Sequence, residues 1–276
     1  MKNCIKVIIL VIVVLSFVLT PSRETISATE LPNYQKLYSQ AVEEGAIDEK
    51  EISYENFLAE NKKTYLPTYE EGITKHVLDF SMDYGTWLKF NNYGQPPKDN
   101  ELMEEVTPKR VQRGVYKEFD VEKGDILVTN GTSSFGILGH AAIANGNNNI
   151  LDIPGFGETT RQLTVKKWCQ TYIDSKGWVK VYRLKNKKIA NQAANWADYN
   201  YYSSNGTSKQ DIKPSYSILG SRYSKDPTYC SKIVIQAYYF GTGKEKVLGY
   251  LPAFVAPYGM NNCFSDSYKL NLVKTY

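Results

Sequence analysis

Residues 124–153 have the sequence GDILVTNGTSSFGILGHAAIANGNNNILDI, and this stretch decides the fold class. It contains short aliphatic runs separated by segments rich in Gly, Asn, Ser and Thr. Such runs bounded by turn residues are typical of β-strands, so we expect strands at 124–128, 139–144 and 150–153. The tight turn at 145–149 predicts that the second and third of these strands are antiparallel neighbours.

The chain downstream predicts one more strand and two helices. Residues 179–184 alternate between apolar and polar side chains, which indicates a fourth strand. A helix is expected at 190–199, a polar loop at 203–213, and a second helix that Asp226-Pro227 opens and Gly241 ends. This order predicts an α+β domain over 114–276, with a small antiparallel sheet packed on helices.

The region before this domain has a helical pattern. Residues 33–90 predict three helices, with Asn33 as the cap of the first and Ser53 as the start of the second. Thr68 and Glu71 have the spacing of a capping box, which predicts the start of the third. Residues 91–100 are rich in Asn, Gly and Pro and indicate a break. We therefore expect a helical N-terminal extension over 29–113.

The first 28 residues have the pattern of a secretion signal peptide. A short basic start precedes an aliphatic run at 5–20, and cleavage is expected after Ala28. An uncleaved anchor is the alternative, because the run approaches the length of a membrane span. Cleavage predicts a secreted or cell-wall-associated protein with no stable membrane span. It also lowers the formal charge from +4 to +2, and the dispersed charge argues against a nucleic-acid partner.

Cysteine and histidine are scarce, with four Cys and two His in 276 residues. Removal of the signal peptide leaves Cys169, Cys230 and Cys263. Cys169 and Cys263 either form a disulfide or remain two buried thiols. The chain has no Cys-x-x-Cys and no His-Glu-x-x-His motif, so we expect no metal site and no cofactor.

Cys230 is the candidate nucleophile. It lies in the first turn of a predicted helix, where the helix dipole stabilises a thiolate. The alternative is a buried Cys that acts as a small hydrophobic residue. A thiol nucleophile needs a base, and His140 begins a strand in the same α+β region, whereas His76 lies on a helix outside it.

A base also needs a group that orients its second ring nitrogen. His140 and Asp152 can lie on one face of neighbouring antiparallel strands, so Asp152 is the expected orienting residue. Asn145 and Asn149 are the alternatives for this role.

Four segments together resemble a known family: Gly124–Leu127, Gly139–Ile143, Ile150–Asp152 and Tyr229–Tyr238. They are similar to the circularly permuted papain-like amidases, a YiiX-like group within the NlpC-type superfamily of cysteine peptidases and amidases. The resemblance covers about residues 115–276. Family members often have Glu where this chain has Asp152, and an acidic residue followed by Leu where it has Lys232-Ile233.

The resemblance implies a permuted papain-like fold with Cys230 as nucleophile, His140 as general base and Asp152 as the orienting residue. It implies a secreted thiol hydrolase that cleaves an amide or peptide bond, with cell-wall peptide as the candidate substrate. One alternative is a lipid or acyl-transfer enzyme on the same fold, and another is a noncatalytic cell-wall-binding module. These residues do not determine the oligomeric state.

Overall fold

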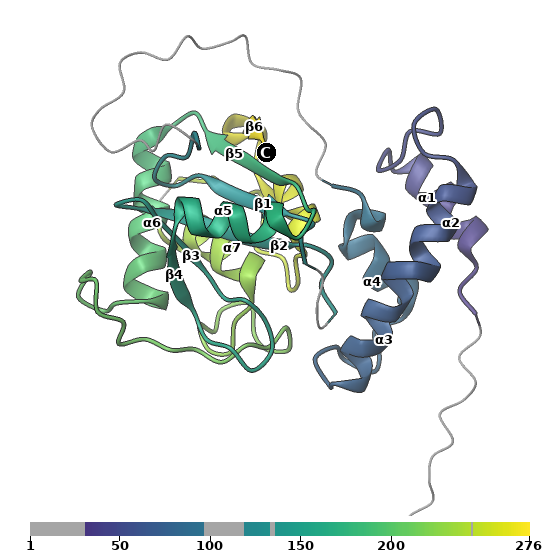
Figure 1. The fold of residues 1–276 in the computed structure, drawn as a ribbon, viewed down its shortest axis with the longest axis horizontal. Helices are drawn as coiled ribbons and strands as arrows, with labels where there is room; N and C mark the ends of the chain where they lie inside the picture. Colours follow the sequence, from purple (N-terminus) through teal and green to yellow (C-terminus); the bar gives the residue numbers. More distant parts are fainter. Residues whose placement is uncertain (1–30, 97–118, 133–135, 244) are drawn as a thin grey trace, which may run out of the picture. The chain divides into compact units, whose positions relative to one another are not determined.

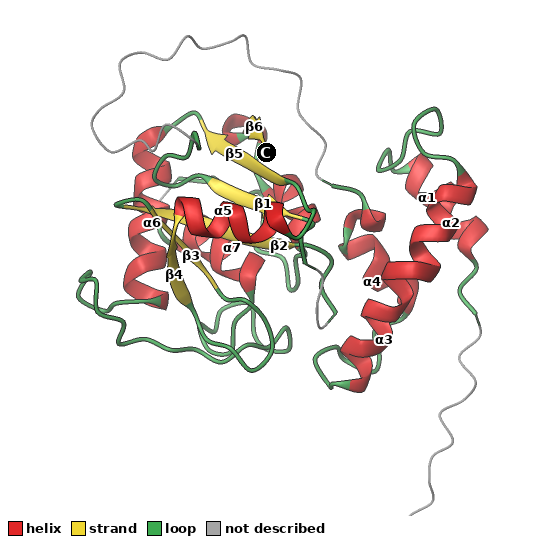
Figure 2. Cartoon of the chain, in the orientation of Figure 1, coloured by secondary structure: helices red, strands yellow, loops and turns green. Residues whose placement is uncertain are grey.

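The computed structural model describes residues 31–96, 119–132, 136–243 and 245–276. Within these ranges the chain has a mixed α+β fold, with seven α-helices and a single antiparallel sheet of six strands (Figures 1 and 2). The strand order is β4-β3-β2-β1-β5-β6. The α+β class predicted from the sequence is therefore confirmed.

The six strands include all four that the sequence predicts. Strands β1 to β6 span Ile126–Thr129, His140–Gly146, Asn149–Asp152, Arg161–Thr164, Val179–Leu184 and Leu270–Thr275. The predicted strands are β1, β2, β3 and β5. The sequence analysis missed β4 and β6, which form the two edges of the sheet.

Of the described helices, the first four precede the strands along the chain and the other three lie between strands. Helices α1 to α7 span Tyr34–Glu43, Tyr54–Glu60, Leu66–Thr74, Tyr84–Phe90, Val165–Asp174, Lys187–Tyr201 and Cys230–Phe240. A π-helical turn at Asn61–Tyr65 joins α2 to α3, and 3-10 turns lie at Asn92–Gly94, Pro257–Cys263 and Asp266–Tyr268. Helix α5 is a further element that the sequence analysis missed.

The two faces of the sheet carry different helices. Ile126 and Val128 of β1 belong to the hydrophobic cluster that contains α6 and α7, whereas Leu127 belongs to a second cluster with α5. This alternation is the two-residue period of a strand. Helix α5 therefore covers one face, and α6 and α7 cover the other.

The N-terminal helices begin partly as predicted. Asn33 caps α1 by accepting a bond from Lys36 N–H at 3.0 Å, and Ser53 caps α2. The predicted capping box at Thr68 is wrong, because Thr68 lies inside α3 and its hydroxyl donates to Thr64 O at 2.7 Å. The region forms four α-helices instead of three, since α3 ends at Thr74 and a separate α4 begins after the Asp83 cap.

Helix α4 is bonded to the chain just before β2. The indole Nε1–H of Trp87 donates to Gly136 O at 2.7 Å, and Asn91 Oδ1 accepts from Leu138 N–H at 2.9 Å. The described residues from Pro32 onward belong to one compact unit. The predicted signal peptide at 1–28 and the domain boundary at 113–114 lie outside the described residues, as do the last four residues of the predicted break at 91–100. None of the described helices is both long and apolar enough to cross a bilayer.

Candidate active site

Helix α7 begins at Cys230, whereas the sequence predicted a helix that opens at Asp226-Pro227. The residues before the helix are paired with another segment: Thr228 forms an isolated bridge with Tyr216, and its N–H donates to Ser215 O at 2.9 Å. This pairing keeps the segment extended. The helix therefore starts later than predicted, and the candidate nucleophile becomes its first residue.

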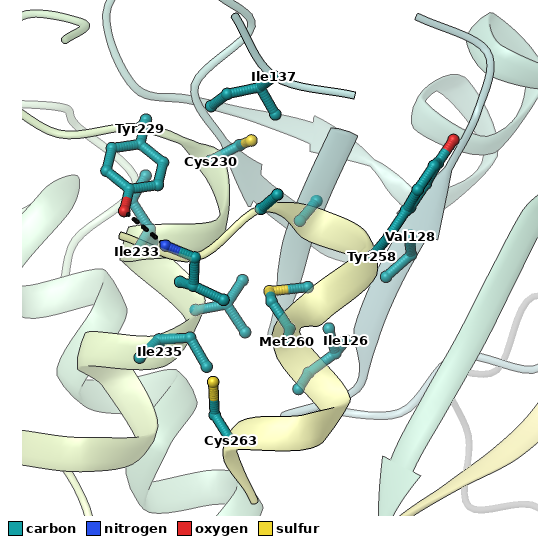
Figure 3. Packing of buried hydrophobic residues seen from close by; sticks show 14 of the residues in the cluster. Ile126, Val128, Ile137, Tyr229, Cys230, Ile233, Ile235, Tyr258, Met260 and Cys263 are labelled. Carbon is teal, nitrogen blue, oxygen red and sulfur yellow. Dashed lines mark hydrogen bonds between the residues drawn. The ribbon is translucent and has the colours of Figure 1, made fainter. Parts of the chain in front are cut away.

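Cys230 lies at the positive end of the α7 dipole. Tyr229 is the N-cap residue, with φ −147° and ψ 168°, and its carbonyl accepts the bond from Ile233 N–H at 3.1 Å. The Tyr229 hydroxyl accepts a bond from Val255 N–H at 3.2 Å (Figure 3), and Ser231 Oγ donates to Val255 O at 2.7 Å. These bonds fix the first turn of α7, where the dipole favours a thiolate.

His140 is the first residue of β2 and lies on the face of the sheet that α5 covers. Its ring stacks on Trp168, with centroids 6.0 Å apart and planes 25° apart, and lies 5.4 Å from the ring of Tyr172. Gly139 precedes it with φ +72°, and a Cβ there would lie 2.4 Å from the Tyr258 ring. A glycine is therefore required immediately before the imidazole.

Asp152 is the last residue of β3, and its Oδ2 lies 2.9 Å from His140 Nε2. The antiparallel pairing of β2 with β3 brings both side chains to one face, as predicted. An ionised carboxylate can only accept hydrogen bonds, so Nε2 carries a proton. Nδ1 is then the nitrogen left for Cys230, the charge of which raises the pKa of His140.

The pKa values of His140 and Asp152 are shifted by their neighbours in the site. Burial alone lowers the pKa of His140, but Cys230 and Asp152 outweigh that effect and raise it to about 9. Burial alone raises the pKa of Asp152, but hydrogen bonds from His140 and Arg161 bring it below its ordinary value. The ionised carboxylate of Asp152 therefore stabilises the positive charge that His140 gains when it takes up a proton.

The other candidates for base and orienting residue have different surroundings. Asn145 donates to Asp198 Oδ1 at 2.9 Å, and Asn149 opens β3 opposite Gly146. His76 follows α3 with φ 55°. Of the three candidates for the orienting role, Asp152 is the one that the described structure bonds to His140.

The sequence analysis missed two further partners of Asp152. Arg161 on β4 donates from Nε to Oδ1 at 2.8 Å and from Nη2 to Oδ2 at 3.2 Å, and Trp168 Nε1–H on α5 donates to Oδ2 at 2.8 Å. A signal for α5 was present, because Val165, Trp168, Cys169 and Tyr172 have the i, i+3, i+4, i+7 spacing of a helix face.

The candidate site is enclosed by apolar side chains in this structure. Cys230, His140 and Asp152 are 3%, 2% and 1% exposed. Cys230 belongs to the same buried cluster as Ile137 and Tyr229, which are drawn around it in Figure 3. In this conformation the thiol is therefore shielded from bulk water.

The cysteines of the described chain are all free thiols. The predicted alternative of a disulfide between Cys169 and Cys263 is therefore wrong, and the two are buried thiols. Burial raises the pKa of each to about 12. Cys169 and Cys263 are thus poor nucleophiles, which leaves Cys230 as the thiol with an adjacent base. In the part of the chain that the structure describes, no group of three His, Cys, Asp or Glu side chains could hold a metal ion.

Comparison with known proteins assigns the chain to a family. The family described as "Lipoprotein N-acylation protein LnsA-like" matches residues 100–276, which is more than half of the chain and includes all three candidate site residues. The chain belongs to this family. An LnsA-like assignment supports the YiiX-like and NlpC-type resemblance only in part, because neither of those groups is the family that matches.

One curated relative and one solved structure are similar to this LnsA-like chain. A Bacillus thuringiensis protein described as "Uncharacterized 30.3 kDa protein" is 43% identical over 272 residues, which are 98% of this chain and 99% of that protein. The crystal structure of the metalloprotein YiiX from Escherichia coli O157:H7 is 15% identical, with a TM-score of 0.37, and the match covers 56% of this chain and 97% of that chain. A TM-score this low does not establish a shared fold.

Proposed function

We propose that the protein is a cysteine-dependent acyl-transfer enzyme in which Cys230 carries the acyl group as a thioester. The observation that carries this proposal is the hydrogen bond between Asp152 and His140, together with the electrostatic interaction of His140 with Cys230, the first residue of α7. A thiol next to a base that a third residue orients is the arrangement of an activated nucleophile. The order of His before Cys along the chain also supports a permuted papain-like arrangement for this domain.

The reaction begins when Cys230 transfers its proton to Nδ1 of His140. The thiolate attacks the carbonyl carbon of an ester or amide donor, and the resulting oxyanion lies near the N–H groups at the start of α7. The leaving alcohol or amine then takes the proton back from His140, and the acyl thioester remains. An amine acceptor attacks the thioester, His140 takes its proton, and the thiol is regenerated with release of an amide.

Two observations favour an amine over water as the acyl acceptor. The family description names N-acylation of lipoproteins, in which the acceptor is an amine. The thiol is also only 3% exposed and lies in an apolar cluster, and exclusion of water protects a thioester from hydrolysis. These points favour acyl transfer over hydrolysis of an amide or of cell-wall peptide, although both reactions use the same thioester. Secretion and attachment to the cell wall remain predictions.

Intact-mass spectrometry tests the thioester directly. The full-length protein is mixed with a p-nitrophenyl acyl ester, quenched in acid and weighed, with and without an added lipopeptide amine. We expect a mass gain equal to one acyl group, lost in Cys230→Ala, retained in the control Cys169→Ser, and discharged faster by the amine than by water. Acylation that persists in Cys230→Ala would refute the mechanism, and discharge by water alone would favour hydrolysis.

A further inference from the structure

Arg161 is directly opposite Asp152 in the ladder between β3 and β4. This register brings its guanidinium against the carboxylate, with bonds of 2.8 Å from Nε and 3.2 Å from Nη2. The Arg161 side chain is 37% exposed, whereas the Asp152 side chain is fully buried. Arg161 therefore brings a positive charge to the site while part of it remains hydrated on the edge strand.

The charge balance of the reactive state explains why this cation matters. When the thiolate forms, the site holds Cys230 negative, His140 positive and Asp152 negative, all at most 3% exposed. Three such charges leave one negative charge in excess inside the protein, which is costly in a medium of low polarity. Arg161 brings the sum to zero.

The other titratable groups near the site do not supply this charge. Tyr172 on α5, and Tyr216 and Tyr229 before α7, interact with the Cys230 thiol and are neutral hydroxyls whose pKa burial raises. Glu158 lies near Arg161 and is acidic. Arg161 is the cation in this set, apart from the imidazolium itself.

We propose that Arg161 is a positioning residue that keeps Asp152 ionised and aligned, and thereby sets the pH range in which Cys230 forms a thiolate beside His140. This inference deepens the proposed function, because it assumes that Cys230 is the nucleophile. Removal of the positive charge makes the thiolate less favourable. Thiolate formation then requires a higher pH.

The test measures the rate at which iodoacetamide alkylates Cys230 between pH 4 and pH 9, by peptide mass spectrometry on the full-length protein. In Arg161→Met we expect the midpoint of the rise in rate to move upward by about one pH unit, which is about a tenfold lower rate on the acid side. Arg161→Lys keeps the positive charge, so its midpoint should lie close to that of the wild type. A wild-type profile in folded Arg161→Met would overturn the proposal.

Arg183 provides a matched control, because it forms a similar pair with buried Asp125, with bonds of 2.8 and 2.7 Å. Arg183→Met should leave the alkylation profile unchanged, and an equal shift in this variant would also overturn the proposal. Arg161→Gln replaces the Met variant if that protein does not fold, and failure of both to fold would show that the residue is structural.

The outcomes separate this inference from the proposed function. A shifted alkylation profile without any acyl thioester would support the role of Arg161 and refute acyl transfer. A thioester together with an unshifted alkylation profile would support acyl transfer and refute the role of Arg161.

Discussion

The fold contains two buried aspartate–arginine pairs whose surroundings differ. Asp152 and Asp125 are each 1% exposed, and each accepts bonds from Nε and Nη2 of one arginine. Asp152 also accepts from an imidazole and an indole. Asp125 instead accepts from a backbone amide, and its partner Arg183 is shared with Asp120.

The surroundings give the two carboxylates opposite pKa shifts. Burial raises the pKa of Asp125 to about 6 in spite of the bonds from Arg183. The pKa of Asp152 is lowered, because hydrogen bonds from His140 and Arg161 outweigh its burial. Hydrogen bonds from one arginine therefore do not by themselves decide the direction in which the pKa of a buried carboxylate shifts. The additional donors keep Asp152 ionised beside His140, whose ring it orients, while Asp125 remains a structural contact.

The largest expected difference between the pairs is in activity. Asp152→Asn should lower kcat/KM for acyl transfer by about 10²- to 10⁴-fold, because the amide no longer fixes the tautomer of His140 that serves as base. Asp125→Asn should retain activity wherever it remains folded. Steady-state release of p-nitrophenol measures both, and equal losses in the two folded variants would remove the distinction.

The second prediction concerns stability against pH, where the two sites should have opposite signs. Asp125 has a raised folded pKa of about 6, so its contribution is full below the unfolded value near 3.8 and is lost as the pH rises through 6. Asp152 has a lowered folded pKa, so its contribution is present above the unfolded value and is lost as the pH falls through the folded value.

Urea unfolding of the wild type, Asp125→Asn and Asp152→Asn at several pH values tests these signs. The stability of the wild type relative to Asp125→Asn should fall by up to about 3 kcal/mol between pH 4 and pH 7. Relative to Asp152→Asn it should fall as the medium is acidified below pH 4. The same sign in both comparisons would contradict the assignment.

A smaller effect is expected from Trp168→Phe. The substitution removes one uncharged donor to Asp152 but keeps an aromatic ring over His140. One such hydrogen bond contributes about 0.5–1.5 kcal/mol, so kcat/KM should fall by about 2- to 13-fold. The alkylation midpoint should stay near that of the wild type, since no charge is lost. A shift as large as that of Arg161→Met would mean that alignment, and not charge, controls the thiolate.

The smallest effect is expected from Asn145→Ala. Asn145 was an alternative orienting residue, but it donates to Asp198. Its removal should leave kcat/KM within about twofold and cost about 0.5–1.5 kcal/mol of stability. Measurement of both quantities on one preparation separates the effects. A loss comparable with that of Asp152→Asn would reassign the orienting role.

Part of this architecture could be predicted because it depends on local patterns. The aliphatic runs that became β1, β2, β3 and β5 are bounded by turn residues, and the tight turn after β2 placed His140 and Asp152 on one face. The edge strand β4 was missed because its residues are only partly buried and have no apolar alternation. Because β4 was missed, Arg161 was missed as well, although its partner Asp152 is only nine residues away along the chain.

The sequence by itself determined the α+β class, the four inner strands of the sheet, and the short list of groups that could act as nucleophile and base. These follow from side-chain periodicity and from the scarcity of Cys and His, which are properties of the chain alone. Only the tertiary structure decided where α7 begins, that Cys169 and Cys263 are not bridged, and that Arg161 and Trp168 bond to Asp152. The physical reason is that burial, strand register and charge compensation arise between segments, after the sheet has brought them together.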